Sequence, residues 1–210
     1  MAKFPAPPAA GGLAARLPAD VKVLPAGTVL WRIYHRGGAH ATGWDQLRHW
    51  GPAAGARFDH HLEPAREQGR GILYAALRVH TCLAEVFQDA RTIERSRNRP
   101  WLAGFALVRD LSLNDLTGGW PTRAGASMAI TSGRRDRARA WSRRIYEDYP
   151  AVDGLHYASS MDANEPALAL YERARTAMAP RPVFHRALAD PALNPAVVKA
   201  ALSFGYLVEP

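Results

Sequence analysis

The chain has 210 residues, of which 48% are hydrophobic, and a net charge of +8 at pH 7. This length provides one substantial core and favours a single domain, and no stretch has the apolar length of a membrane-spanning helix or of a secretory signal. The only cysteine, Cys82, cannot form an internal disulfide, which excludes a disulfide-stapled secreted scaffold and leads us to expect a soluble, cytoplasmic protein.

The first predicted segment, residues 1–26, is an N-terminal arm. Its five prolines and two adjacent glycines cannot sustain a helix or a central strand. Residues 28–34 follow with β-branched and aromatic side chains and predict a strand. Alternation places Arg32 on one strand face with Leu30 and Tyr34, where an unpaired guanidinium is costly. We therefore expect Arg32 to meet an internal carboxylate or an anionic ligand.

The second part of the chain is predicted as a long loop followed by a strand. Residues 37–71 contain glycine, histidine and proline without periodicity, and this loop carries Arg57. Residues 71–79 alternate as a strand with one apolar core face. Tyr74 lies on the other, more polar face, where its ring could stack on a ligand.

A helix is predicted for residues 81–90, with Thr81 as its N-cap. Glu85 lies off the apolar stripe of this helix, among polar side chains. The segments that follow are a basic connection over 91–99, a strand over 101–108, an extended piece over 111–116 and a loop with the sequence GGWPTRAG.

The last third of the chain alternates helices and strands irregularly. Residues 134–148 predict an amphipathic helix whose exposed face carries arginines. Asp190 can cap the final helix, which Gly205 terminates. The predicted segments are strands over 155–159, 166–171 and 183–188 and a helix over 191–203. This order favours an α+β fold, a single domain with a central mixed or antiparallel β core flanked by a few helices.

Five polar residues in or beside these apolar segments suggest chemistry on NAD. Arg32 and Arg57 could clamp a pyrophosphate through charge-assisted hydrogen bonds, and Tyr74 could stack on a base or on nicotinamide. Glu85 could bind ribose hydroxyls and stabilise the oxocarbenium-like state that forms when the nicotinamide–ribose bond breaks. Ser159 could orient the Glu85 carboxylate or the ribose. Taken singly, each residue also has an ordinary structural interpretation.

The order of four segments strengthens this hypothesis: LWRIY, GARF, GILYAA with a glutamate eleven positions after its tyrosine, and DGLHYASS. Together they resemble the RES domain family, which is named for its Arg, Glu and Ser. The similarity extends over residues 27–209 and includes the closing PALNPAVVKAALSFGYLV.

The resemblance implies an ADP-ribosyltransferase-like fold, with residues 27–210 as the NAD-binding catalytic domain. It implies a toxin of a toxin–antitoxin pair that acts on NAD and is neutralised by an antitoxin with an Xre-like DNA-binding region. The catalytic residues implied are Glu85, Arg32 and Ser159, and the residues implied to bind NAD are Arg32, Arg57 and Tyr74.

One position departs from the family pattern, and at another the sequence offers two adjacent serines for the same role. Many members carry G-R-(F/W)-(N/S) where this chain has GARFD, so a contact near Asp59 differs. Ser159 is preferred over its neighbour Ser160 because it shares a strand face with Tyr157, but Ser160 stays open. Also open are the acceptor of ADP-ribose, which can be water, phosphate or a protein, and whether the chain forms a homodimer.

Two other functions are compatible with the sequence. The arginine-rich segments 91–99 and 134–148 could contact nucleic-acid phosphates or an acidic antitoxin segment. Their sparse aromatic residues, essentially Trp101 and Trp141, disfavour direct nucleic-acid binding. A RES-like fold that has lost catalysis would be an interaction module. We expect no metal, because the histidines form no H-E-x-x-H pair and Cys82 has no C-x-x-C companion.

Overall fold

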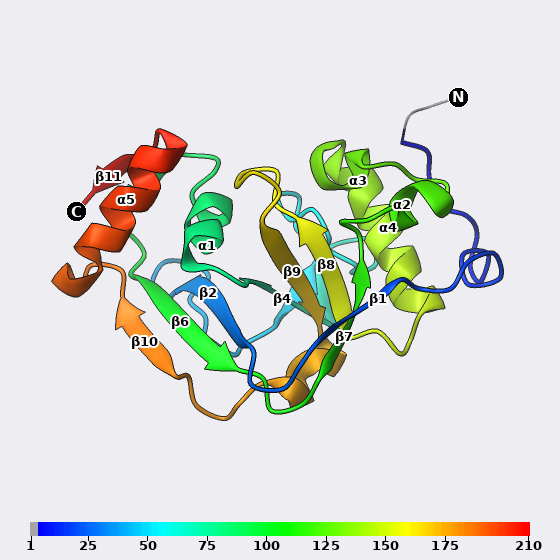
Figure 1. The fold of residues 1–210 in the computed structure, drawn as a ribbon, viewed down its shortest axis with the longest axis horizontal. Coiled ribbons are helices and arrows are strands. Elements are labelled where there is room, and N and C mark those ends of the chain that lie inside the picture. The colour runs from blue at the N-terminus through cyan, green and yellow to red at the C-terminus, as the bar shows by residue number, and fades with distance from the viewer. Residues whose placement is uncertain (1–3) are drawn as a thin grey trace.

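A nine-stranded mixed sheet forms the centre of the computed structural model, which describes residues 4–210 (Figure 1). A small second sheet pairs β5 with β11. The strands are β1 (Val21–Leu24), β2 (Val29–His35), β3 (Arg48–Gly51), β4 (Arg66–Ala76), β5 (Thr92–Glu94), β6 (Pro100–Ala106), β7 (Leu111–Asp115), β8 (Gly154–Ala158), β9 (Pro166–Tyr171), β10 (Phe184–Ala187) and β11 (Leu207–Glu209). The helices are α1 (Val79–Val86), α2 (Trp120–Arg123), α3 (Ala129–Ser132), α4 (Arg135–Asp148) and α5 (Asn194–Phe204), with 3₁₀ turns η1 (Glu172–Ala177) and η2 (Pro191–Leu193).

The strand order in the large sheet is β1-β7-β8-β9-β4-β2-β6-β10, and β3 also pairs with β4. Strands β7 and β8 are parallel and the other neighbours are antiparallel. Strands β4 and β2 pair only through Ala76 and Trp31, whereas β4 and β9 pair along five residues. The two halves of the sheet therefore meet at a short junction, and the predicted α+β fold with a mixed sheet is confirmed.

Two groups of helices cover separate parts of one sheet face. Helix α4, with α2 and α3, packs over the β4, β8 and β9 region, while α1 and α5 pack over β2 and β6 (Figure 1). Ile72 belongs to the first cluster and Ala76 to the second. Tyr74 lies between them on β4, so it faces the boundary between the two helix groups.

The opposite face of the sheet is also buried. Leu73 and Ala75 of β4 pack there with side chains of β2, β6, β7 and β9 and with η1. The prediction of a single core face for this strand was wrong, because helices from later in the chain cover the other face.

The N-terminal segment is held to the domain by hydrogen bonds to its backbone, from both strand pairing and side chains. Strand β1 pairs with β7 at the sheet edge. The Asp148 carboxylate, at the end of α4, accepts hydrogen bonds from the amides of Gly11 and Leu13, and the Trp141 indole donates to the Pro5 carbonyl. Leu13 is buried in the core cluster below α4.

Several predicted boundaries need correction. The predicted loop over 37–71 contains β3 and the first half of β4, and GGWPTRAG contains α2, whose Trp120 is fully buried. Helix α1 begins at Val79 and ends at Val86, and Thr81 does not cap it, because its hydroxyl donates to Asp162. Asp190 caps η2 rather than α5, whereas Gly205 ends α5 in the left-handed conformation as expected.

The arginines of α4 are less free than predicted. Arg139 donates to the Ala54 carbonyl, Arg143 donates to the His61 carbonyl, and Arg144 pairs with Glu147. These side chains are half-buried, so much of the charge of this helix is committed to internal contacts. No helix within residues 4–210 combines the length and the apolar character needed to cross a lipid bilayer.

Candidate active site

The Glu85 carboxylate is held by the Ser159 hydroxyl. Ser159 follows the last residue of β8 and is fully buried, and its Oγ donates to Oε1 of Glu85 on α1 at 2.5 Å. The Met161 amide donates to the same Oγ at 3.2 Å, which fixes the direction of the serine. Glu85 is partly buried rather than solvated, although it lies off the apolar stripe of its helix. Two residues 74 positions apart are therefore brought together where α1 meets the end of β8.

Arg57 lies on the other side of this contact, in the loop before β4. Its Nη1 donates to the Gly133 carbonyl just after α3, at 2.6 Å. Within residues 4–210 its Nε and Nη2 make no hydrogen bond or ion pair, so they are free for an anion. The guanidinium is close enough to Glu85 for each charge to affect the pKa of the other group.

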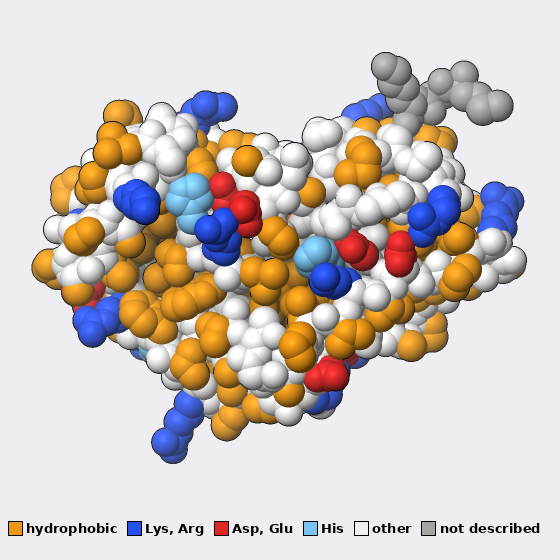
Figure 2. All heavy atoms as spheres, in the orientation of Figure 1, with side chains coloured by type: hydrophobic (Ala, Val, Ile, Leu, Met, Phe, Trp, Pro, Cys, Tyr) orange, Lys and Arg blue, Asp and Glu red, His pale blue; other side chains and the backbone are white. Residues whose placement is uncertain are grey.

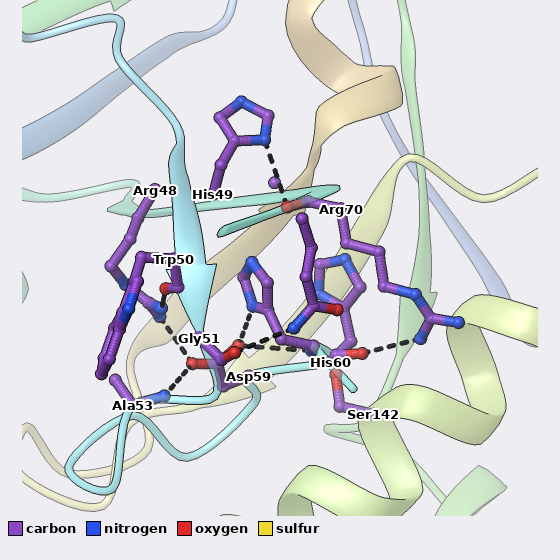
Figure 3. A network of polar contacts seen from close by, with 12 residues as sticks. Arg48, His49, Trp50, Gly51, Ala53, Asp59, His60, Arg70 and Ser142 are labelled. Carbon is purple, nitrogen blue, oxygen red and sulfur yellow. Dashed lines mark hydrogen bonds and ion pairs between the residues drawn. The ribbon is translucent and has the colours of Figure 1, made fainter. Parts of the chain in front are cut away.

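The Arg57 loop is fixed by a buried polar network (Figure 3). The Asp59 carboxylate is fully buried and accepts from Arg48 at 2.8 Å and from the Ala53 amide at 2.6 Å, and it also contacts the His61 ring. Ser142 of α4 donates to the Phe58 carbonyl at 2.7 Å. At the position where this chain departs from the family pattern, Asp59 thus forms an internal ion pair with Arg48.

Two tyrosines lie next to the Arg57 loop and contact Phe58. The Tyr74 hydroxyl accepts a hydrogen bond from the Phe58 amide at 3.0 Å, so this side chain positions the residue after Arg57. Tyr157 of β8 packs its ring on Phe58, with ring centroids 4.6 Å apart. Burial raises the pKa of the Tyr157 hydroxyl, and the charge of Glu85 raises it further. Sequence reasoning did not assign a role to Tyr157, although it lies in the DGLHYASS segment.

Arg32 is not joined to this group by a direct contact among residues 4–210. Its neighbours Trp31 and Ile33 pack beside α1, so the Arg32 side chain leaves β2 on the opposite face. Its Nη1 donates to the carbonyls of Trp44 and Gln46, both at 2.9 Å. Inside the protein Arg32 therefore meets carbonyl oxygens rather than an internal carboxylate, which was one of its two expected partners.

Burial shifts the pKa of each charged group. It lowers the pKa of Arg32 to about 10 and also lowers that of Arg57, which is further lowered by the charge of Arg135 and raised by that of Glu85. Burial raises the pKa of Glu85, while the Ser159 hydrogen bond and the Arg57 charge oppose this rise. Such desolvated charges are stabilised by ligand charges of the opposite sign.

Ser160, the alternative to Ser159, is exposed and lines a cavity with His80 and Ser203. Among residues 4–210, no group of three or more His, Cys, Asp or Glu side chains is arranged to hold a metal ion. A hydrogen bond joins Ser159 to Glu85, and Tyr74 and Tyr157 both contact Phe58, the residue after Arg57. Arg57 and Glu85 are linked through the effect of each charge on the pKa of the other group.

Comparison with known families matches residues 29–190 to the RES domain, and all five predicted site residues lie in this range. The fold is similar to that of a chain in the crystal structure of the M. tuberculosis MbcT–MbcA toxin–antitoxin complex, with a TM-score of 0.58 and 16% sequence identity. The alignment covers 89% of this chain and 96% of that chain. No match is found among curated protein sequences.

Proposed function

The chain belongs to the RES domain family, and from this premise we propose that it is an enzyme that consumes NAD by breaking the nicotinamide–ribose bond. The observation that carries the proposal is the hydrogen bond between Ser159 and Glu85, with the Arg57 guanidinium near enough for its charge to lower the pKa of Glu85. These residues lie at the boundary between the two helix groups, where residues of α1, β4, β8 and the Arg57 loop converge.

The proposed chemistry uses a fixed negative charge. When the glycosidic bond breaks, nicotinamide leaves as a neutral molecule with the bonding electron pair, and positive charge develops on the ribose. A carboxylate held by Ser159 stabilises this charge more strongly in the transition state than in bound NAD. Because Glu85 is already oriented and partly desolvated, little reorganisation is needed. Water, phosphate or a protein side chain then takes the ADP-ribose.

The arginines supply the binding energy for the phosphates. Arg57 has unpartnered N–H groups beside Glu85, so we assign it to the pyrophosphate. Arg32 is assigned to the phosphates by the resemblance of its LWRIY segment alone, since its side chain leaves β2 on the face opposite α1 and donates to the Trp44 and Gln46 carbonyls. Tyr74 holds the Arg57 loop through Phe58, and its ring offers a stacking surface to the dinucleotide.

We further propose that the protein is a toxin that acts on cytoplasmic NAD and is neutralised by an antitoxin. Family membership and the fold shared with a chain of a toxin–antitoxin complex support this proposal. An Xre-like antitoxin is the partner that the family resemblance implies.

Nicotinamide release from NAD by the purified chain tests the enzymatic proposal. The wild type is expected to release nicotinamide, and Glu85→Gln is expected to lose this activity while keeping its fold. Glu67→Gln is the matched control, because Glu67 is an exposed glutamate of β4. An inactive wild type, or a Glu85→Gln variant as active as the wild type, would contradict the proposal.

A further inference from the structure

A second group of chemically complementary side chains lies where α1 meets α5 and the β8–β9 turn. The Oγ atom of Ser203, in the last turn of α5, is 2.6 Å from Nε2 of His80 on α1. The Nδ1 atom of His80 is 3.1 Å from both carboxylate oxygens of Asp162, in the β8–β9 turn. A hydroxyl, an imidazole and a carboxylate thus follow one another in the order of a nucleophile, its base and the group that orients the base.

The surroundings of each member fit these roles. Asp162 is buried and also accepts a hydrogen bond from the Thr81 hydroxyl at 2.7 Å, so its carboxylate is fixed. With Nδ1–H directed to Asp162, Nε2 of His80 carries the lone pair that accepts the Ser203 proton. Ser203 is exposed, and its hydroxyl has the Ala200 carbonyl as a second acceptor at 2.8 Å.

The three side chains open onto a cavity of about 480 Å³. Aromatic and apolar side chains line one part of it, including Phe204, whose ring packs on His80 with centroids 4.1 Å apart. In Figure 2 a histidine is visible between acidic and basic side chains where α1 and α5 of Figure 1 lie side by side. The His80 side chain is 36% exposed and Ser203 is exposed, so the group is accessible to a small molecule.

The same cavity offers groups that stabilise negative charge. The Arg91 side chain lines it and makes no hydrogen bond or ion pair with any of residues 4–210. Ser160, Asp162 and Ala163 also line it, and their backbone N–H groups have no acceptor within the described part of the chain. An oxyanion or an acidic substituent would find donors there.

We propose that Ser203, His80 and Asp162 form a second catalytic site that hydrolyses small carboxylic esters, with a preference for esters that carry a negative charge. Ser203 Oγ bonds to the acyl carbon as its proton passes to His80, and the bond from this carbon to the alcohol oxygen breaks. The alcohol leaves with the proton from His80. Water then attacks the acyl-serine with His80 again taking a proton, which returns to Ser203 as the carboxylic acid is released.

The proposal concerns a cavity and a reaction separate from NAD cleavage, so either can fail without the other. The test uses the purified full chain with p-nitrophenyl acetate and mono-p-nitrophenyl succinate, and measures p-nitrophenol release. The wild type is expected to hydrolyse both and to prefer the succinate ester. His80→Gln and Ser203→Ala should each lower the rate at least ~100-fold, since general acid–base catalysis typically contributes that much.

A control separates this site from ordinary surface reactivity. Ser132 is also an exposed serine at a helix end, so Ser132→Ala should hydrolyse the esters at the wild-type rate. A fluorophosphonate probe should label Ser203 of the unmodified chain, as located by peptide mass spectrometry. Equal rates for wild type and Ser203→Ala, or a label on a serine other than Ser203, would overturn the proposal. Ser203→Ala should leave nicotinamide release from NAD unchanged.

Discussion

Removal of the Ser159 hydroxyl tests how Glu85 is prepared for catalysis. Ser159→Ala deletes the donor that lies 2.5 Å from Oε1 of Glu85 and leaves the carboxylate in its partly buried place. A hydrogen bond to a charged group is worth about 1.5–3 kcal/mol. If this energy is felt in full in the transition state, kcat/KM for NAD falls roughly 10- to 150-fold.

The pH dependence of kcat/KM gives a second, independent test of the Ser159 hydrogen bond. The Ser159 hydrogen bond lowers the pKa of Glu85 against the upward effect of burial, so its loss raises that pKa further. Because the proposed chemistry needs the ionised carboxylate, the acidic limb of the kcat/KM profile should move to higher pH. Nicotinamide release measured across a pH series provides both quantities.

Ser160→Ala is the matched control for this experiment, because Ser160 is adjacent in sequence but exposed and outside the Glu85 contact. It should keep the wild-type rate and pH profile. Superimposable profiles for Ser159→Ala and wild type, or a larger effect at Ser160, would refute the reasoning.

Four further variants probe binding and stability. Arg57→Ala should raise KM for NAD more than it lowers kcat, and an unchanged KM would remove Arg57 from the pyrophosphate site. Burial raises the pKa of Glu85 above 4.5, so above this pH the folded chain holds a proton that the unfolded chain releases, and the stability of the wild type falls as the pH rises. Glu85→Gln should therefore have a higher melting temperature than wild type at pH 7, by about 2–4 °C for each kcal/mol of unfolding free energy gained. This advantage should disappear below pH 4.5. Burial lowers the pKa of His60 to about 4, so between pH 6.5 and pH 4 this imidazole is protonated in the unfolded chain but not in the folded chain. Wild type should therefore lose unfolding free energy as the pH falls through this range. In His60→Gln, the unfolding free energy measured with urea should change less over the same range. Trp141→Ala empties a core position that is 1% exposed and should cost about 3–5 kcal/mol in urea unfolding; a loss below 1 kcal/mol would contradict the packing described.

The sequence predicted elements well where local patterns and tertiary packing agree. Strands β2 and β9 and helix α4 begin and end within a residue or so of the predicted ranges, because their β-branched runs or helical apolar stripe are continuous. The early part of β4 was missed because Arg66 and Glu67 are exposed, charged residues that carry no apolar alternation. Helix α2 was missed because four residues with a proline give no helical period.

In the candidate site, too, local patterns predicted some features and missed those that depend on contacts between distant segments. The resemblance selected Glu85 by its spacing from Tyr74, but helical periodicity alone placed it on a solvated face. Its burial depends on Ser159, which arrives from the end of β8 far along the chain, and no local pattern encodes that contact. The orientation of Arg32 could be predicted from alternation, whereas its carbonyl acceptors in the loop before β3 could not.

The most direct test of the account is a crystal structure of Glu85→Gln with NAD bound. The account predicts that the nicotinamide–ribose bond lies beside residue 85 and Ser159, and that the Arg57 guanidinium contacts the pyrophosphate. NAD bound elsewhere on the protein, away from residue 85, Ser159 and Arg57, would contradict it.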